Sequence, residues 1–232
     1  MKKQILVIGL GRFGISIANT LQNMGHDVLA VDWDEKAVAN VVNTLTRAVQ
    51  ADATNETFLN EIGVKDFDVA IVAIGAGVES SVLCTILLKK MGVKHIIARA
   101  DEQLHGSILE KIGADVVVYP ELEMGLRTAH RVNMRDVTDY MPVGVGYGIA
   151  AVPAFPSIIG LRVFDLGFGQ SGKWEIALLL IQRKNEVIVS PVGGEIIREH
   201  DILIVSGADD KMQHLLAEAK QNKRETFIHE QT

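Results

Sequence analysis

The sequence predicts an α/β protein with a doubly wound parallel sheet, followed by a small α+β lobe with an antiparallel sheet. The chain opens with a short apolar run, Ile5 to Ile8, that ends in the pattern Gly9-x-Gly11-x-x-Gly14. Apolar runs of strand length then alternate with helical patterns up to about residue 119, which is typical of a parallel sheet. Beyond residue 140, strand-length runs separated by glycine and proline replace that alternation.

The first half of the chain is predicted to form six strands joined by helices. Apolar runs without polar interruption are typical of strands that are buried on both faces. Glycines at positions 63, 92 and 113 follow helical patterns and predict where those helices end. The expected strands are Ile5–Ile8, Asp27–Val31, Ala48–Asp52, Asp68–Gly75, Lys94–Arg99 and Asp115–Val118, and the expected helices are Ile15–Met24, Lys36–Leu45, Thr57–Ile62, Ser80–Met91, Gln103–Ile112 and Glu121–Val132.

The second half is predicted to be a lobe of mixed strands and helices after a polar joint at Asn133–Met141. The domains are expected at 1–120, with a connecting helix and joint at 121–140, a C-terminal lobe at 141–221 and a frayed tail at 222–232. In this lobe, strands are expected at Tyr147–Ala154, Glu175–Gln182, Glu186–Ser190 and Asp201–Ser206, and helices at Ser157–Leu166 and Asp209–Gln221.

The glycine pattern has a specific chemical use when it stands between a strand and a helix. Gly9 makes the turn, Gly11 lets the backbone approach a pyrophosphate, and Gly14 packs the helix on the strand. The second strand ends at Asp32, where a Rossmann-like nucleotide site places the carboxylate that binds ribose. The alternative is that Asp32 caps the helix that begins near residue 34. An aspartate at this position disfavours NADP, whose 2′-phosphate would meet a negative charge.

Ligands of such a sheet bind at the carboxyl ends of its strands. Arg12 and Arg99 are cations near the expected phosphates, although arginines at loop tips are also commonly just solvated. Glu121 could hold a metal ion or face a second subunit, or it could simply be an acidic charge at a helix N-terminus. The candidate nucleotide-binding residues are Gly9, Gly11, Arg12, Phe13, Gly14, Asp32, Asp34, Asp52, Ala53, Ile74, Gly75 and Arg99.

The whole-chain properties narrow the class of protein. A net charge of −6 over 232 residues argues against a nucleic-acid-binding surface. Cys84, the single cysteine, lies in an apolar pattern and is expected to be a buried thiol. The sequence contains no run of about 18 apolar residues, so no membrane span is expected. Met1 to Lys3 lead directly into a strand rather than a signal peptide, so a cytoplasmic protein is expected.

Seven segments of the sequence carry a resemblance to a known family. They are Val7–Gly14, Ala30–Asp32, Val72–Gly75, Leu109–Asp115, Tyr119–Gly125, Glu186–Pro191 and Asp201–Gly207. Through these segments the sequence resembles the cytoplasmic regulatory subunits of Ktr/Trk potassium uptake systems, which carry an RCK domain (regulator of potassium conductance). The similarity is strong through residue 125, looser beyond residue 140, and covers nearly the full chain.

The resemblance implies an N-terminal lobe that binds ATP or ADP, with NAD(H) as an alternative ligand. It implies that Gly9–Gly14 and Arg12 hold phosphate, that Asp32 holds the ribose, that Asp52 and Ala53 hold the adenine, and that Glu121 helps to bind Mg²⁺ or Ca²⁺ with ATP. It also implies a homodimer that assembles into a ring, expected to be an octamer, on a membrane potassium-translocating subunit. Ktr-type C-terminal lobes can bind cyclic di-AMP. Here Leu166–Gly172 replaces a more charged family stretch, which weakens that expectation.

The main alternative function is that of a NAD-dependent oxidoreductase or epimerase. Such an enzyme needs an acid or base that faces the nicotinamide, and the sequence offers no convincing residue for that role. A redox-sensing repressor is a third class, but no helix-turn-helix flanks the nucleotide domain. The sequence therefore favours a nucleotide-binding regulatory protein over an enzyme.

Overall fold

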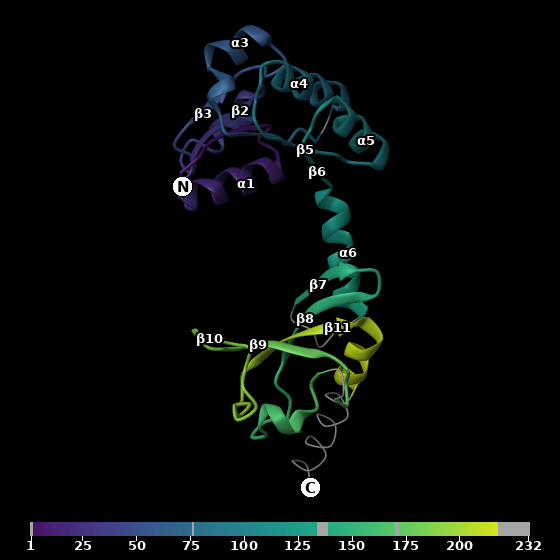
Figure 1. Ribbon diagram of the computed structural model, residues 1–232. Coiled ribbons are helices and arrows are strands. Elements are labelled where there is room, and N and C mark those ends of the chain that lie inside the picture. Colours follow the sequence, from purple (N-terminus) through teal and green to yellow (C-terminus); the bar gives the residue numbers. More distant parts are fainter. Residues whose placement is uncertain (1, 76, 134–138, 170–171, 218–232) are drawn as a thin grey trace. The chain divides into compact units, whose positions relative to one another are not determined.

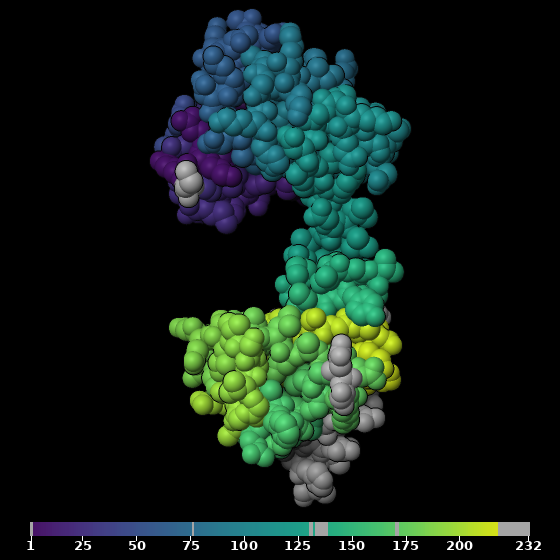
Figure 2. Space-filling view, in the orientation of Figure 1, coloured from purple at the N-terminus to yellow at the C-terminus, as the bar shows by residue number. Residues whose placement is uncertain are grey.

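The computed structural model describes residues 2–75, 77–133, 139–169 and 172–217. The chain forms two compact units, Met1–Glu123 and Met124–Thr232. Each unit has its own sheet (Figure 1) and is closely packed in the space-filling view (Figure 2). Each also has its own hydrophobic core. Within the described residues, no helix is both long and apolar enough to cross a lipid bilayer.

The first unit contains a six-stranded sheet in which every strand pair is parallel. The strand order is β3-β2-β1-β4-β5-β6, so the chain reverses its direction of winding between β1 and β4. This arrangement confirms the predicted doubly wound sheet, and its switch point is where such folds bind ligands. The strands are β1 (Gln4–Ile8), β2 (Asp27–Asp32), β3 (Ala48–Gln50), β4 (Val69–Val72), β5 (Ile96–Arg99) and β6 (Val116–Val118).

Helices cover both faces of this sheet (Figure 1). The pleat of β1 shows why: Ile5 and Val7 belong to the core under α1 and α2, whereas Leu6 and Ile8 belong to the core under α3, α4 and α5. Both sides of β1 are therefore apolar, as its sequence predicts. The helices are α1 (Arg12–Asn23), α2 (Glu35–Ala39), α3 (Glu56–Glu61), α4 (Val78–Lys90) and α5 (Gln103–Ile112), with a 3₁₀ turn at Val64–Asp66.

The helix expected at Lys36–Leu45 is wrong in its length. The observed helix α2 ends at Ala39, and turns follow it. The sequence after Ala39 is rich in asparagine and β-branched residues, which favour a helix weakly. Val41 and Leu45 instead bury their side chains against the sheet from non-helical backbone.

The second unit contains a five-stranded antiparallel sheet, which confirms the predicted class of this lobe. The strand order is β10-β9-β11-β8-β7. Helix α6 (Pro120–Asn133) precedes the sheet along the chain, and a further helix occupies residues 209–217. The strands are β7 (Asp139–Gly144), β8 (Tyr147–Pro153), β9 (Ala177–Arg183), β10 (Glu186–Val189) and β11 (Ile202–Ala208).

Two sequence-based expectations for this lobe are wrong. Strand β7 lies partly within the expected polar joint, and its Pro142 is tolerated because β7 is an edge strand. The helix expected at Ser157–Leu166 is a series of turns that ends in a 3₁₀ helix, Val163–Leu166. Gly160 adopts φ +85°, and its N–H donates to Ile197 O at 2.9 Å, so a hydrogen bond to a distant segment interrupts the turns of this one.

Some expectations lie outside the described residues. These are the frayed tail at 222–232, most of the distal half of the last expected helix, the middle of the joint at 134–138, and Gln170 and Ser171 of the segment compared with the cyclic di-AMP site.

Candidate functional site

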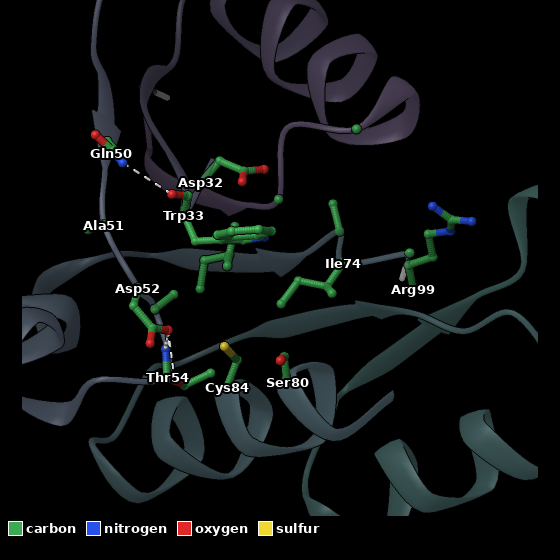
Figure 3. Close-up of a pocket in the computed structure, with 16 residues that line it drawn as sticks. Asp32, Trp33, Gln50, Ala51, Asp52, Thr54, Ile74, Ser80, Cys84 and Arg99 are labelled. Atoms are coloured by element: carbon green, nitrogen blue, oxygen red, sulfur yellow. Dashed lines mark hydrogen bonds between the residues drawn. The ribbon is translucent and has the colours of Figure 1, made fainter. Parts of the chain in front are cut away.

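A cavity of about 840 Å³ opens at the carboxyl ends of the strands in the first unit. It lies at the switch point of the sheet, as the fold class predicts. Figure 3 shows side chains entering it from the end of β2, from the segment after β3, from α4 and from the end of β5. The predicted residues that line it are Gly9, Gly11, Asp32, Asp52, Ala53, Ile74, Gly75 and Arg99.

The glycine turn makes room for a ligand at one end of the cavity. Gly9 has φ +98°, and a Cβ there would lie 2.9 Å from the backbone carbon of Ala73. A Cβ at Gly14 would collide with Gly9 O, so this glycine lets α1 pack closely on β1. The space beside Gly11 holds no protein atom within 4 Å of where its Cβ would stand. These positions match the three roles that the spacing predicts.

The N-terminus of α1 is open toward the turn. Gly11 caps the helix without a side-chain hydrogen bond, and no acidic residue occupies the first turn. The first N–H groups of a helix have no partner within it, and the helix dipole adds positive potential there. The site therefore presents donors and positive potential to an anionic group such as phosphate.

Asp32 is held in place by backbone groups on both sides. Its Oδ2 accepts from the Leu10 N–H at 2.6 Å, and its Oδ1 accepts from the Asp34 N–H at 2.9 Å. Asp34, not Asp32, caps α2 by accepting from the Lys36 N–H at 3.0 Å. The helix-cap alternative for Asp32 is thus filled by Asp34, while each Asp32 carboxylate oxygen keeps about one lone pair that can accept from a ribose hydroxyl.

Arg99 lines the cavity beside Gly75, near the glycine turn. Its side chain is only 15% exposed, and its Nη2 donates to Asp101 Oδ1 at 2.9 Å and to Glu121 Oε1 at 2.8 Å. The guanidinium lies against Gly75, where any side chain would collide with it. The Arg99 Nε is buried and has no hydrogen-bond partner among the described residues. Arg99 therefore brings to the cavity a cation with one N–H donor that the described residues leave unpaired.

The metal prediction for Glu121 is untested by this geometry and stays a prediction. Glu121 begins the first turn of α6, and its side chain is 66% exposed. Among the described residues, no group of three or more His, Cys, Asp or Glu side chains could hold a metal ion. A divalent cation at Glu121 would therefore need most of its oxygen ligands from a bound phosphate or from water.

The segment after β3 forms the far wall of the cavity. Asp52 Oδ1 accepts from the Thr54 hydroxyl at 2.7 Å and from the Thr54 N–H at 2.8 Å. The hydroxyl bond, followed by the N–H bond, lowers the pKa of Asp52 below its ordinary value. Cys84 is buried as expected, and burial followed by the charge of Asp52 raises the pKa of its thiol to about 12.

Five predicted residues do not line the cavity. Gly14 lies beneath the turn, Phe13 packs into the core under α1, and Asp34 serves α2 as its cap. Arg12 is exposed at the first position of α1, and Glu121 reaches the cavity only through its ion pair with Arg99. Each of these residues neighbours the site in the chain or contacts a lining residue.

Sequence reasoning missed several lining residues. Trp33, Gln50, Thr54 and Ser80 all face the cavity (Figure 3). A signal was available for Trp33, because a large aromatic residue between two aspartates directly after a strand has no place in the sheet. Ser80 gave no such signal, since serine is common in the first turn of a helix.

The sequence matches the TrkA-N domain family over residues 5–120. It is 40% identical to Ktr system potassium uptake protein C of Bacillus subtilis (strain 168), over 90% of this chain and 93% of that protein. It is 33% identical to Ktr system potassium uptake protein A of Vibrio alginolyticus, over 92% of this chain and 96% of that protein.

The chain belongs to the Ktr/Trk potassium uptake family. This membership confirms the resemblance that the sequence motifs indicate, and it confirms the expectation of a regulatory protein rather than an enzyme.

Solved structures with low sequence identity share the fold of this Ktr/Trk family member. The GsuK RCK domain superposes with a TM-score of 0.63 at 16% identity, over 94% of this chain and 47% of that one. The GsuK channel bound to NAD gives a TM-score of 0.62 at 15% identity, over 91% of this chain and 38% of that one. The chain therefore spans less than half the length of the GsuK chains it matches.

Proposed function

We propose that this protein binds an adenine nucleotide in the cavity at the switch point and uses it to regulate a membrane potassium-translocating subunit. The observation that carries the nucleotide assignment is the convergence of the open glycine turn, the helix N-terminus and Asp32 on one cavity. Membership in the Ktr/Trk potassium uptake family supports the regulated partner.

The candidate ligands are ATP, ADP and NAD(H), which share an adenosine and a pyrophosphate. In this proposal, the glycine turn and the α1 N-terminus bind phosphate, Asp32 binds the ribose, and Asp52 with Ala53 lines the adenine end. Arg99 adds a cation near the phosphates. The Asp32 carboxylate would repel a 2′-phosphate, so NADP is disfavoured.

The finer features of the family scheme are part of this proposal. They are a homodimer that assembles into a ring of eight copies, attachment to the cytoplasmic side of the membrane through the partner subunit, and a divalent cation that Glu121 and the ATP phosphates bind together. We do not extend the proposal to cyclic di-AMP, because the segment Leu166–Gly172 lacks the charges that a doubly anionic ligand needs.

The alternative of an oxidoreductase or epimerase finds little support in the cavity. A general acid or base works best when its pKa lies near the operating pH. Asp52 has a lowered pKa, and the Cys84 thiol has a pKa of about 12, so neither group exchanges protons readily near neutral pH. Among the described residues that line the cavity, there is no histidine, lysine or tyrosine.

Calorimetric titration of the purified chain with ATP, ADP and NADH tests the nucleotide assignment. We expect Asp32→Asn to weaken binding of all three ligands by about 1–3 kcal/mol, because a hydrogen bond to a charged group is lost. Asp27→Asn is the matched control, because Asp27 lies at the opposite end of the same strand and forms an ion pair with exposed Lys2. Unchanged binding by Asp32→Asn would contradict the ribose assignment.

The regulatory assignment needs the partner. Potassium flux into vesicles that contain the membrane subunit should change when this chain is added, and the change should depend on which nucleotide is present. Oxidation or reduction of a small molecule with NAD by the isolated chain would instead favour the enzyme alternative.

A further inference from the structure

Trp33 is an exposed aromatic side chain in a cavity. It directly follows Asp32 at the end of β2, projects into the cavity (Figure 3), and is 77% exposed. Tryptophan is usually among the well-buried residues of a protein. In the described part of the first unit, Trp33 belongs to neither hydrophobic cluster, so its ring does no packing work for the fold.

The backbone that carries Trp33 is nevertheless fixed. Asp32 Oδ1 accepts from the Asp34 N–H at 2.9 Å, which closes a turn around Trp33. The Gln50 side-chain amide donates to Trp33 O at 3.3 Å and ties this turn to the end of β3. The backbone on both sides of Trp33 is therefore fixed before any ligand arrives, and the indole that it carries lines the cavity. Such preorganisation reduces the entropy lost on binding.

The position of Trp33 along the cavity indicates which part of a ligand it meets. This step rests on the nucleotide assignment proposed above. The glycine turn and Arg99 mark the phosphate end, and Asp32 marks the ribose. What remains for the base is the space bounded by Trp33 and by the segment from Gln50 to Thr54. A planar base in that space has the indole as its aromatic neighbour.

We propose that Trp33 stacks on the base of the bound nucleotide and gives the site a preference for purines over pyrimidines. Stacking of a base on an aromatic side chain contributes to binding whichever base is present, because every base has a π-face. A purine offers two fused rings to the indole and a pyrimidine offers one, so the larger overlap favours the purine.

Tryptophan fluorescence can report directly on the surroundings of Trp33, because the sequence contains just one other tryptophan, Trp174. Trp174 is 4% exposed and lies in the core of the second unit, whereas the residues that line the cavity belong to the first unit. In Trp174→Phe, Trp33 is the only tryptophan, and we expect ADP to quench its emission with the dissociation constant that calorimetry gives. In Trp33→Phe, the remaining emission should not change. The difference between wild-type and Trp33→Phe titrations gives the same signal if Trp174→Phe does not fold.

Calorimetry with ADP and UDP tests the preference itself. We expect Trp33→Leu to weaken ADP binding about 5- to 100-fold, to weaken UDP binding less, and so to reduce the ratio of the two affinities. Trp33→Phe should keep most of the ratio. Asp32→Asn is the comparison variant, because both ligands share the ribose and should lose affinity equally.

The outcomes separate this inference from the function on which it rests. If neither nucleotide binds the wild-type chain, the proposed nucleotide site is wrong. If nucleotides bind but Trp33→Leu keeps the wild-type ratio, or Trp33 emission does not respond, the stacking role is wrong and the nucleotide site stands. If Trp33→Leu leaves both affinities unchanged and lowers the mass measured by light scattering, Trp33 contacts a second copy of the chain, which also overturns the inference.

Discussion

A single nitrogen of Arg99 joins the cavity to helix α6. Its Nη2 donates to both Asp101 and Glu121, while Nε has no partner in the part of the chain that the structure describes. A phosphate in the cavity would compete with these two carboxylates for the guanidinium, because an arginine binds phosphate and carboxylate in the same geometry. A bound triphosphate would thus release Glu121, whose carboxylate could then share a divalent cation with it.

Neutralising Glu121 tests this exchange at the scale of one residue. We expect Glu121→Gln to reduce ATP affinity in the presence of Mg²⁺ by about tenfold or more, since loss of a group that supports a bound metal commonly costs that much. ADP affinity should change less. Calorimetry with and without Mg²⁺ measures both effects.

Glu123→Gln is the matched control, because Glu123 also lies in the exposed first turn of α6. Equal losses for ATP and ADP in Glu121→Gln, or no dependence on Mg²⁺ or Ca²⁺ in the wild-type chain, would contradict the cation role.

At the scale of elements, a buried ion pair ties the second sheet to the loop before β11. The Arg183 side chain, at the end of β9, donates from Nε and Nη2 to the two oxygens of Asp201, at 2.9 and 2.8 Å. Asp201 is fully buried, and it also accepts from the Arg198 N–H. Glu195 accepts from the same guanidinium. Removal of the Asp201 charge would break the two-bond pair and leave the Arg183 guanidinium with Glu195 as its remaining carboxylate partner among the described residues.

We expect Asp201→Asn to lower the free energy of unfolding of the second unit by about 3–5 kcal/mol at pH 7, which is typical of a broken buried ion pair. Burial alone would raise the pKa of Asp201, but the Arg183 side chain and the Arg198 N–H lower it below its ordinary value. Because the folded-state pKa lies below the unfolded value, this stability is present above about pH 4 and is lost as the pH falls further. Denaturant titrations between pH 3 and pH 7 would measure it.

The exposed pair between Arg162 and Asp165 provides the control. Asp165→Asn should change stability by less than about 1 kcal/mol, because solvent screens that pair. If Asp201→Asn destabilises the chain no more than Asp165→Asn does, the buried pair has no structural role.

The sequence predicts elements well where one physical rule decides them. Strands such as β1 and β4 are apolar on both faces, so their residues allow no other buried structure. The secondary structure of the lobe after α6 is harder to predict, because hydrogen bonds between segments distant in the sequence determine it. The segment around Gly160 bonds to Ile197 across the fold, and the edge strand β7 alternates weakly and contains Pro142. Neither the hydrogen bond from Gly160 to Ile197 nor the pairing of β7 with β8 can be inferred from the local sequence.

The residues of the candidate site fall into the same two groups, those that local sequence predicts and those that only the fold brings to the cavity. The glycine turn and Asp32 were predictable because backbone room and a strand-end carboxylate are local demands. Gln50 and Ser80 reach the cavity only because β3 and α4 are brought beside β1 and β2 in the fold. Trp33 is easily noticed in the sequence, but only its 77% exposure in the structure shows that it is not part of the hydrophobic core.

At the scale of the whole molecule, the two units have separate cores, and the candidate nucleotide residues lie in the first unit. A ligand stabilises the state it binds by RT ln(1 + [L]/Kd), which is about 2.7 kcal/mol at one hundred times the dissociation constant. We therefore expect scanning calorimetry to resolve two transitions, of which ADP raises the one that belongs to the first unit. Asp201→Asn assigns the other, because it should lower only the transition of the second unit. A single transition that both ADP and Asp201→Asn shift would mean that the two units unfold cooperatively, and it would show that nucleotide binding is coupled to the stability of the whole chain.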